Sequence, residues 1–147
     1  YIKKNFNLGI GDKMAEDVKI QIGSAVPIEE ELMMHVKGRD YLTGLPRSVE
    51  ICTNEIVRAI GKELRTIINA MKDVLQETPP ELAADIIDNG IIMTGGSSLL
   101  RNFPELVFRR TVVKARLAKD APFCVAKGTG EALKHLDAYK KAIIAKR

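Results

Sequence analysis

The stretch Ile91-Ile-Met-Thr-Gly-Gly-Ser-Ser-Leu-Leu100 joins an apolar triplet to paired glycines and then to a helix start. Three apolar residues bounded by turn residues predict a buried strand. The glycines permit a close backbone approach, and a helix start offers free N–H groups to a polar ligand. This order predicts an α/β unit with a ligand at the turn. The plainer alternative is a tight turn without a ligand, and the spacing matches neither a P-loop nor a Rossmann fingerprint.

The residues before this stretch predict a long amphipathic helix. It opens at Thr53 or Asn54 and ends at Thr78-Pro-Pro80, because proline disrupts a helix interior but fits a first turn. The same prolines start the next helix, and we place a subdomain boundary there. Apolar residues at steps of three and four predict the core stripe of the long helix, which comprises Ile56, Val57, Ile60, Leu64, Ile67, Ile68, Met71, Val74 and Leu75.

Further upstream, alternating apolar and polar residues predict a β-hairpin. One strand covers residues 30–37, the other covers residues 48–52, and Gly38 begins the turn between them. The period of two places His35 on the more exposed face.

Two helices are predicted before the hairpin. Residues 1–9 have the pattern of the last turns of a helix that closes on Gly9, and Asp12 caps a second helix that ends at Gly23. The apolar face of the second helix comprises Ala15, Val18 and Ile22. A neighbouring polar face carries Glu16 and Lys19, since positions three apart on a helix point the same way.

The residues after the glycine turn predict a helix, a strand and two more helices. Asn102 and Pro104 open the first of these helices, and residues 113–118 form a candidate strand. The helix over residues 122–133 is interrupted by Gly128 and Gly130. A last amphipathic stripe comprises Leu136, Tyr139 and Ile143.

Composition places the chain among soluble globular proteins. It has 147 residues, of which 46% are hydrophobic and 29% charged, and no run of about 18 apolar residues that could cross a bilayer. A cytoplasmic protein is the default. Cys52 and Cys124 lack a paired spacing and are interpreted as buried thiols. His35 and His135 have no second ligand at helical spacing, so we expect no metal site made of protein ligands alone.

Six ordered segments carry a family resemblance. They are Gly9-Ile-Gly-Asp-Lys-Met-Ala-Glu-Asp-Val-Lys-Ile-Gln-Ile-Gly-Ser-Ala25, Lys37-Gly-Arg-Asp40, Thr43-Gly-Leu-Pro46, Thr78-Pro-Pro-Glu-Leu-Ala-Ala-Asp-Ile-Ile-Asp88, Thr94-Gly-Gly96 and Cys124-Val-Ala-Lys-Gly-Thr-Gly130. Together they span nearly the whole chain and resemble the motifs of the MreB family of bacterial actins, which organise rod-shaped cells.

The resemblance implies an α/β, actin-like (ribonuclease H-like) ATPase fold, of which this chain is the second-domain portion only. Residues 1–77 then resemble the small subdomain of that domain, and residues 78–147 resemble the later part of its large subdomain. The glycine-rich hairpins that hold the phosphates in this family lie upstream and have no counterpart here. We therefore expect a fragment that contains no catalytic residues, with ATPase activity confined to the intact protein.

The same resemblance implies the nucleoside side of an ATP site. From one subdomain, Glu16, Asp17, Val18 and Lys19 approach the adenosine, and Glu16 and Lys19 are the polar partners. From the other, Gly95, Gly96, Ser97 and Ser98 pass close to base and sugar. The intact protein would also bind Mg. Without the family, a surface Glu–Lys pair of little energetic importance is the simpler interpretation of residues 16 and 19.

Some positions depart from the family pattern. Ser97 stands where the family often has a third glycine and so lacks easy access to positive φ. Val112 and Lys114 replace a usual glycine and proline, and Met14 replaces a usual threonine. These changes affect the expected geometry of local turns rather than the assignment of the fold.

The function implied by the resemblance is that of a filament-forming ATPase that determines cell shape at the inner membrane face. Its expected partners are other filament subunits and membrane-associated proteins of cell-wall synthesis, with indirect membrane contact for this half and no nucleic acid. One alternative is another actin-fold ATPase, of the sugar kinase or chaperone type. A second is a small basic nucleic-acid module that uses Arg109, Arg110, Lys114, Arg116 and Lys119.

Overall fold

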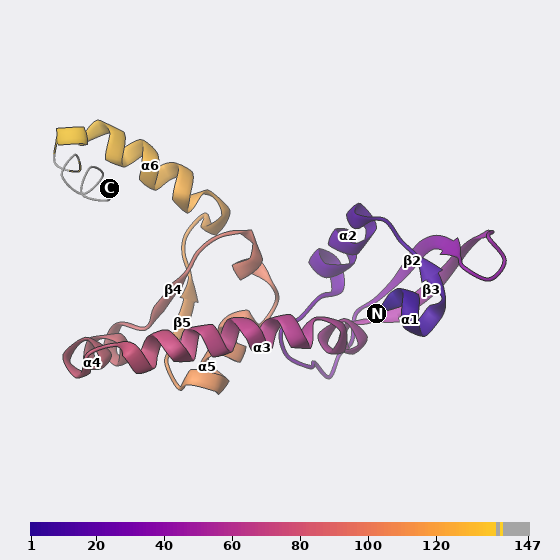
Figure 1. The fold of residues 1–147 in the computed structure, drawn as a ribbon, viewed down its shortest axis with the longest axis horizontal. Helices are drawn as coiled ribbons and strands as arrows, with labels where there is room; N and C mark the ends of the chain where they lie inside the picture. Colours follow the sequence, from indigo (N-terminus) through magenta and orange to yellow (C-terminus); the bar gives the residue numbers. More distant parts are fainter. Residues whose placement is uncertain (138, 140–147) are drawn as a thin grey trace.

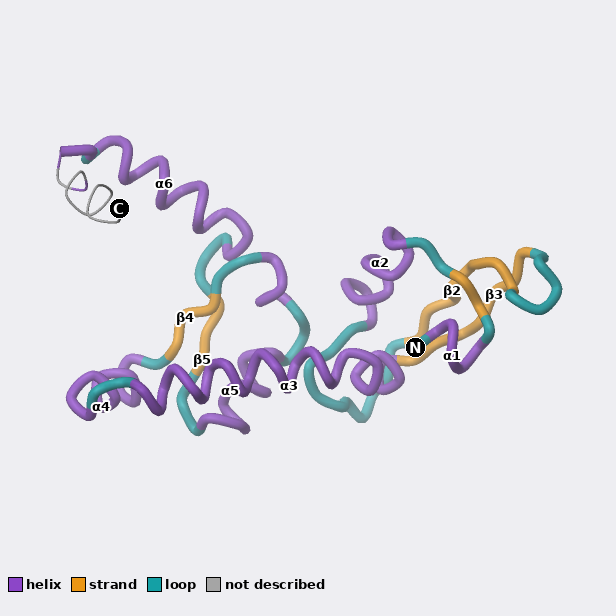
Figure 2. The backbone as a smooth tube through the Cα atoms, in the orientation of Figure 1, coloured by secondary structure: helices purple, strands orange, loops and turns teal. Residues whose placement is uncertain are grey.

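In the computed structural model, residues 1–137 and 139 are described, and they form an elongated molecule (Figure 1). The elements in chain order are α1 (Ile2–Phe6), β1 (Leu8–Gly9), α2 (Asp12–Ile22), β2 (Met33–Asp40), β3 (Pro46–Cys52), α3 (Thr53–Glu77), α4 (Pro80–Asn89), β4 (Ile91–Met93), η1 (Gly96–Leu99), α5 (Phe103–Thr111), β5 (Ala115–Leu117), η2 (Ala121–Phe123) and α6 (Cys124–Lys134). Helix α3 runs along the molecule, and the strands gather in two separate places beside it (Figure 2).

The N-terminal part is built on an antiparallel sheet with the order β1-β2-β3. The predicted hairpin is confirmed: β2 pairs with β3 from Met33 opposite Cys52 to Arg39 opposite Pro46, and His35 is exposed. Side chains from the sheet, α2 and the first turn of α3 form one apolar core, because each element turns its apolar face inward. This core comprises Leu8, Val18, Ile22, Val36, Ile51 and Ile56.

Three details near the sheet differ from the sequence prediction. Strand β2 continues through Gly38 to Asp40 instead of turning at Gly38, since β1 pairs with its end. A Cβ on Gly38 would lie 2.3 Å from the carbonyl oxygen of Gly9, so the glycine serves a close approach of two strands. Helix α1 closes at Asn7, in the left-handed region at φ 52, and Gly9 belongs to β1.

The structure also corrects the predicted start and apolar face of α2. Gly11 is the N-cap of α2, and Asp12 is its first residue rather than its cap. Ala15 is exposed, while Met14 packs against the apolar core in its place. The predicted end of α2 at Gly23 is confirmed.

The C-terminal part has a two-stranded parallel sheet, β4-β5. The crossover between these strands runs through η1 and α5, as parallel strands require a connection that returns to the same edge. The start of α4 at Pro80 and the opening of α5 at Asn102 are confirmed. A second apolar core comprises Ala25, Leu64, Ile68, Met93, Phe103 and Val107.

Several apolar residues of this part are less buried than the sequence suggests. Ile92 is 53% exposed, because the two-stranded sheet has one face that no described element covers. On α3, Ile67 and Val74 are exposed rather than part of the core stripe. Helix α6 runs without interruption through Gly128 and Gly130. Of the predicted last stripe, Leu136 and Tyr139 are exposed, and Ile143 lies outside the described residues.

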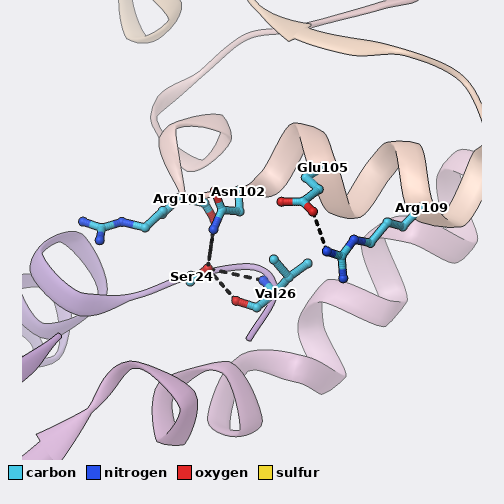
Figure 3. A network of polar contacts seen from close by, with 6 residues as sticks. All are labelled: Ser24, Val26, Arg101, Asn102, Glu105 and Arg109. Carbon is cyan, nitrogen blue, oxygen red and sulfur yellow. Dashed lines mark hydrogen bonds and ion pairs between the residues drawn. The ribbon is translucent and has the colours of Figure 1, made fainter. Parts of the chain in front are cut away.

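Helix α3 joins the two parts, since Ile56 belongs to the first core and Leu64 and Ile68 belong to the second. The proposed subdomain boundary near residue 77 stays a prediction. A polar contact also connects the two parts (Figure 3): Ser24 pairs with Arg101 in an isolated parallel bridge, and the Ala25 N–H donates to the Arg101 carbonyl at 2.8 Å.

The buried Ser24 hydroxyl lies at the centre of this contact. Its Oγ donates to the Val26 carbonyl at 2.7 Å and accepts from the Asn102 side-chain amide at 3.3 Å. Ser24 is fully buried. The hydrogen bond from Asn102 links the segment after α2 to the turn before α5, and the bond to Val26 holds the segment itself in shape. We call these residues, Ser24, Arg101 and Asn102, the inter-part latch.

Both cysteines are free and half-buried rather than fully buried. A hydrogen bond to Glu31, together with burial, raises the pKa of the Cys52 thiol above its usual value. Within the described residues, no helix combines the length and the apolar character that a membrane span needs.

Candidate functional site

A cavity of about 810 Å³ lies between α2, the N-terminal half of α3 and η1. In Figure 1, α2 and the segment after β4 stand on the same side of α3. The cavity is lined by Glu16, Lys19, Ile20, Ala59, Ile60, Glu63, Leu64, Ile67, Gly96, Ser97, Leu99, Leu100, Arg101 and Phe103. Its size is in the range of small-molecule and cofactor sites.

Helix α2 supplies the polar wall of the cavity. Val18 and Ile22 point into the first core, and this fixes the rotation of the helix about its axis. Glu16 and Lys19 then share the exposed face beside the cavity, because they are three positions apart. A carboxylate that accepts and an ammonium that donates can together bind a pair of hydroxyl groups.

The glycine turn supplies the opposite wall. Gly95 has φ 86 and ψ 162, a conformation that is almost restricted to glycine. Its N–H donates to the Ala121 carbonyl at 2.8 Å, and its carbonyl accepts from the Ser98 hydroxyl at 2.7 Å. The turn is therefore held from both sides, and it presents Gly96 and Ser97 to the cavity.

Serine fits at position 97, although the family often has a glycine there. Among the described residues, the positive φ of this turn falls on Gly95, and Ser97 lies in the 3₁₀ turn that follows. The departure from the family pattern at Ser97 is thus accommodated. Gly96 has open space around the position of a Cβ, so the chain itself does not require a glycine there.

The α3 wall was not predicted. Ala59, Glu63 and Ile67 recur at steps of four and line the cavity together. Ile67 was predicted to lie in the core, but it is 43% exposed and lines the cavity wall. The available signal was Glu63 itself, a carboxylate seven positions after Ile56 that interrupts the apolar stripe on that side of α3.

The cavity is electrostatically balanced. Its lining includes two carboxylates, Glu16 and Glu63, and two cations, Lys19 and Arg101, so the formal charges cancel. Apolar side chains, among them Ile20, Ile60 and Phe103, complete the walls. This chemistry suits an uncharged ligand with an apolar planar part and hydroxyl groups better than a polyanion.

Half of the predicted nucleotide-binding residues meet in this cavity. Glu16, Lys19, Gly96 and Ser97 line it. Val18 is buried in the first core, and Ser98 is 4% exposed with its hydroxyl bonded to Gly95. Asp17, Val18, Gly95 and Ser98 do not line the cavity. Val18 positions α2 through the first core, and the Gly95–Ser98 hydrogen bond holds the glycine turn. Their direct contact with a ligand stays a prediction.

The cationic cluster of the nucleic-acid alternative is divided. Arg109 and Arg110 line a groove against α3, whereas Lys114 and Arg116 line a different hollow beside β5. Arg109 also forms an ion pair with Glu105 (Figure 3). These cations do not form one continuous track for a phosphate backbone, which argues against this alternative.

Comparison with solved structures defines the class of protein. The fold matches MreB5 of Spiroplasma citri bound to ADP, with a TM-score of 0.88, 38% sequence identity and coverage of 97% of this chain and 43% of that chain. It also matches the MamK double helical filament with a TM-score of 0.67 at 20% identity, over 83% of this chain and 37% of that chain. The chain therefore has part of an actin-like fold.

The family follows from the sequence comparisons. The model of the MreB/Mbl protein family matches residues 1–141, and the chain belongs to this family. It is 41% identical to the cell shape-determining protein Mbl of Bacillus cereus, over 96% of this chain and 42% of that protein. It is 39% identical to the cell shape-determining protein MreB of Escherichia coli, over 93% of this chain and 40% of that protein. The chain thus spans about two fifths of the length of these relatives.

Proposed function

We propose that the cavity between α2, α3 and η1 binds the nucleoside part of ATP. The observation that carries the proposal is the meeting of Glu16 and Lys19 with Gly96 and Ser97 in one cavity, although the two pairs lie about 80 positions apart in the chain. The likeness to MreB5 structures bound to ADP and to AMPPNP supports it.

Each wall has a role in this proposal. Glu16 accepts hydrogen bonds from the ribose hydroxyls, and Lys19 donates to a ribose or base oxygen or nitrogen. The backbone at Gly96 and Ser97, which carries no bulky side chain, lies against the base, and Ile67 covers an apolar edge. The balanced charge of the cavity leaves the phosphates, with Mg, to residues of the intact protein beyond this sequence.

The charge balance also predicts what these residues do alone. Phosphate and metal contacts supply much of the binding energy and nearly all of the catalysis in ATP hydrolysis. We expect the chain of residues 1–147 to bind ATP feebly and to show no ATP turnover. Steady phosphate release with micromolar affinity, after contaminating ATPases are removed, would mean that a complete active site is present.

For the whole protein we propose a filament-forming ATPase that determines cell shape in the cytoplasm, at the inner membrane face. The relatives named cell shape-determining proteins support this role. Nucleotide that bridges two domains biases them toward a closed arrangement, and closure favours the contacts between subunits. Membrane-associated proteins of cell-wall synthesis are the proposed partners, and residues 1–77 and 78–147 are the proposed subdomain portions.

Paired variants test the nucleoside site. We expect Glu16→Ala with Lys19→Ala to lower nucleotide affinity about tenfold, because two hydrogen-bonding groups are lost from the ligand. Thermal stability should hardly change, since exposed side chains contribute little to folding. The matched control is Lys62→Ala with Asp73→Ala, which removes one exposed charge of each sign from α3 outside the cavity. Fluorescence titration that finds equal affinity in all three proteins would refute the site.

A further inference from the structure

We propose that a basic groove on the other side of α3 binds an acidic amphipathic helix of a partner protein. The groove has a volume of about 680 Å³ and lies between α3, α5 and the segment after α2. Five cations line it, namely Arg58, Arg65, Lys72, Arg109 and Arg110, and its lining contains no carboxylate. The apolar part of the lining comprises Ala25, Val26, Val57, Leu64, Ile68 and Leu106.

The cations of this basic groove are available for a partner. Arg109 pairs with Glu105, but among the described residues no ion pair includes Arg65, Lys72 or Arg110. Arg58 donates a hydrogen bond to Tyr1 and lies in the field of Glu55, and both raise the pKa of its guanidinium. The groove thus concentrates positive charge, which this chain offsets in part through Glu105 at Arg109 and through Glu55 near Arg58.

The spacing of the cations indicates the shape of the partner. Arg58, Arg65 and Lys72 follow one another at steps of seven on α3, so they lie on one face and are about 10.5 Å apart along the axis. A partner helix packed along α3 returns to the same face every seven residues and can place carboxylates at the same interval. An extended strand covers this interval in about three residues, which would turn alternate carboxylates away.

The apolar floor favours a helix for a second reason. A helix packed in a groove buries its apolar stripe at the bottom and keeps its charged flanks at the rims, where Arg65 and Arg110 stand. A flat lipid surface would contact the rims but not the floor. A nucleic acid would gain the charge contacts without using the apolar side chains, and Phe, Tyr and Trp are absent from the lining.

The basic groove is distinct from the proposed nucleoside cavity. Ala59, Glu63 and Ile67 face the cavity, whereas Arg58, Arg65 and Lys72 face the groove. Leu64 lines both, whereas Ala25 and Val26 line the groove alone and Arg101 lines the cavity alone. Both sites can therefore be occupied at the same time.

The experiment uses a designed peptide as the probe. A helical peptide of about 21 residues carries a leucine stripe flanked by glutamates at seven-residue spacing, and its control has the same composition with the glutamates placed off that spacing. Fluorescence anisotropy measures binding to the chain at low and moderate salt. We expect the spaced peptide to bind at least about fivefold tighter than the control peptide, and to weaken as salt rises.

Charge reversal assigns the binding to the groove. Arg65→Glu with Arg110→Glu should weaken the spaced peptide about tenfold or more, while Lys62→Glu with Lys13→Glu, outside the groove, should change it less than about threefold. Melting curves show that each variant is folded, and the single Arg65→Glu variant replaces the double variant if the latter fails to fold.

Several results would overturn the proposal. They are no binding of the spaced peptide at low salt, equal binding of both peptides, or equal losses in both charge-reversed pairs, which would show a response to net charge alone. Vesicles of anionic lipid and a DNA duplex serve as competing probes. If either binds tighter than the spaced peptide and depends on Arg65 and Arg110, the basic groove belongs to that ligand instead of an acidic helix.

Discussion

Val112 is the residue whose backbone most clearly conflicts with its side chain. It ends α5 in the left-handed region, at φ 62 and ψ 3, and its N–H donates to the Phe108 carbonyl at 2.8 Å. This conformation suits glycine, and a β-branched side chain is strained in it. The family resemblance indicates a usual glycine here, so the chain keeps the turn geometry and accepts the strain.

We therefore predict that Val112→Gly raises the free energy of unfolding by about 1 kcal/mol, because the left-handed conformation costs an L-residue about that much. The side chain is 81% exposed, so little packing is lost. Urea denaturation measures the change. The neighbouring Val113 is buried, and Val113→Gly should instead destabilise; a loss of stability in both variants would show that the backbone at Val112 is not strained.

Asp40 stabilises the tip of the β2–β3 hairpin through its ionised carboxylate. The carboxylate accepts from the backbone N–H groups of Thr43 and Leu42, at 2.9 and 2.8 Å, and pairs with Arg47 at 3.0 Å. These hydrogen bonds, more than the attraction of Arg47, lower the pKa of Asp40 below its ordinary value of 3.8. Protonation of the carboxylate thus costs more in the folded chain than in the unfolded chain.

The direction of this shift predicts a pH dependence. A folded-state pKa below the unfolded value stabilises the fold above pH 3.8, and that stabilisation is lost as the pH falls through the lower, folded pKa. Wild-type melting temperature should therefore fall more steeply between pH 5 and pH 2 than that of Asp40→Asn, which cannot titrate. Parallel curves for the two proteins over that range would show that Asp40 does not cause the pH dependence of stability.

At the scale of elements, the inter-part latch holds the segment after α2 against the turn before α5. Ser24→Ala should lower the free energy of unfolding by about 1 to 2 kcal/mol, because the partly buried Asn102 amide loses its acceptor and the Val26 carbonyl loses its donor. Thermal or urea denaturation measures it. Ser48→Ala on the exposed face of β3 is the control and should leave stability unchanged; equal effects of the two substitutions would contradict the role of the latch.

Elements with a strong local pattern could be predicted from the sequence. The hairpin, α3, α4, α5 and both strands of the parallel sheet follow from apolar periodicity and from proline positions, because these signals lie within the element itself. The extension of β2 through Gly38 could not, since it depends on pairing with β1, about thirty positions away in the chain. The continuity of α6 through its glycines likewise overrides a local propensity.

The candidate site was predictable to the extent that the family motifs mark it. Glu16, Lys19, Gly96 and Ser97 were identified from motifs, and the structure brings them to one cavity. The α3 wall was missed because Ile67 fits the apolar stripe by spacing, and only the rotation of α3 against two cores shows which side it faces. The basic groove was missed for the same reason, as Arg65 and Arg110 meet through the packing of α5 on α3.

At the scale of the whole molecule, α3 is the common wall of two sites and of two cores. One side of it faces the balanced cavity, the other faces the basic groove, and its buried residues join the N-terminal sheet to the C-terminal sheet. Helix α3 also places any nucleotide between the two parts of the chain, where binding can act on their arrangement.

Gly96→Val is the substitution that tests nucleoside binding in the cavity most closely. A Cβ at Gly96 would have no atom within 4 Å apart from its chain neighbours, so the chain has room for a side chain there, and valine would extend into the space proposed for the ligand. Gly128→Val, at an equally open position on α6 away from the cavity, is the matched control.

The measurement is nucleotide affinity of the intact protein by fluorescence titration, with melting temperature recorded for each variant. If the cavity binds the nucleoside, Gly96→Val should weaken ATP binding by about 1 to 3 kcal/mol at little cost in melting temperature. Gly128→Val should bind ATP like the wild type. Wild-type ATP affinity in a folded Gly96→Val protein would contradict the assignment of the nucleoside to this cavity, because the base would then bind somewhere else.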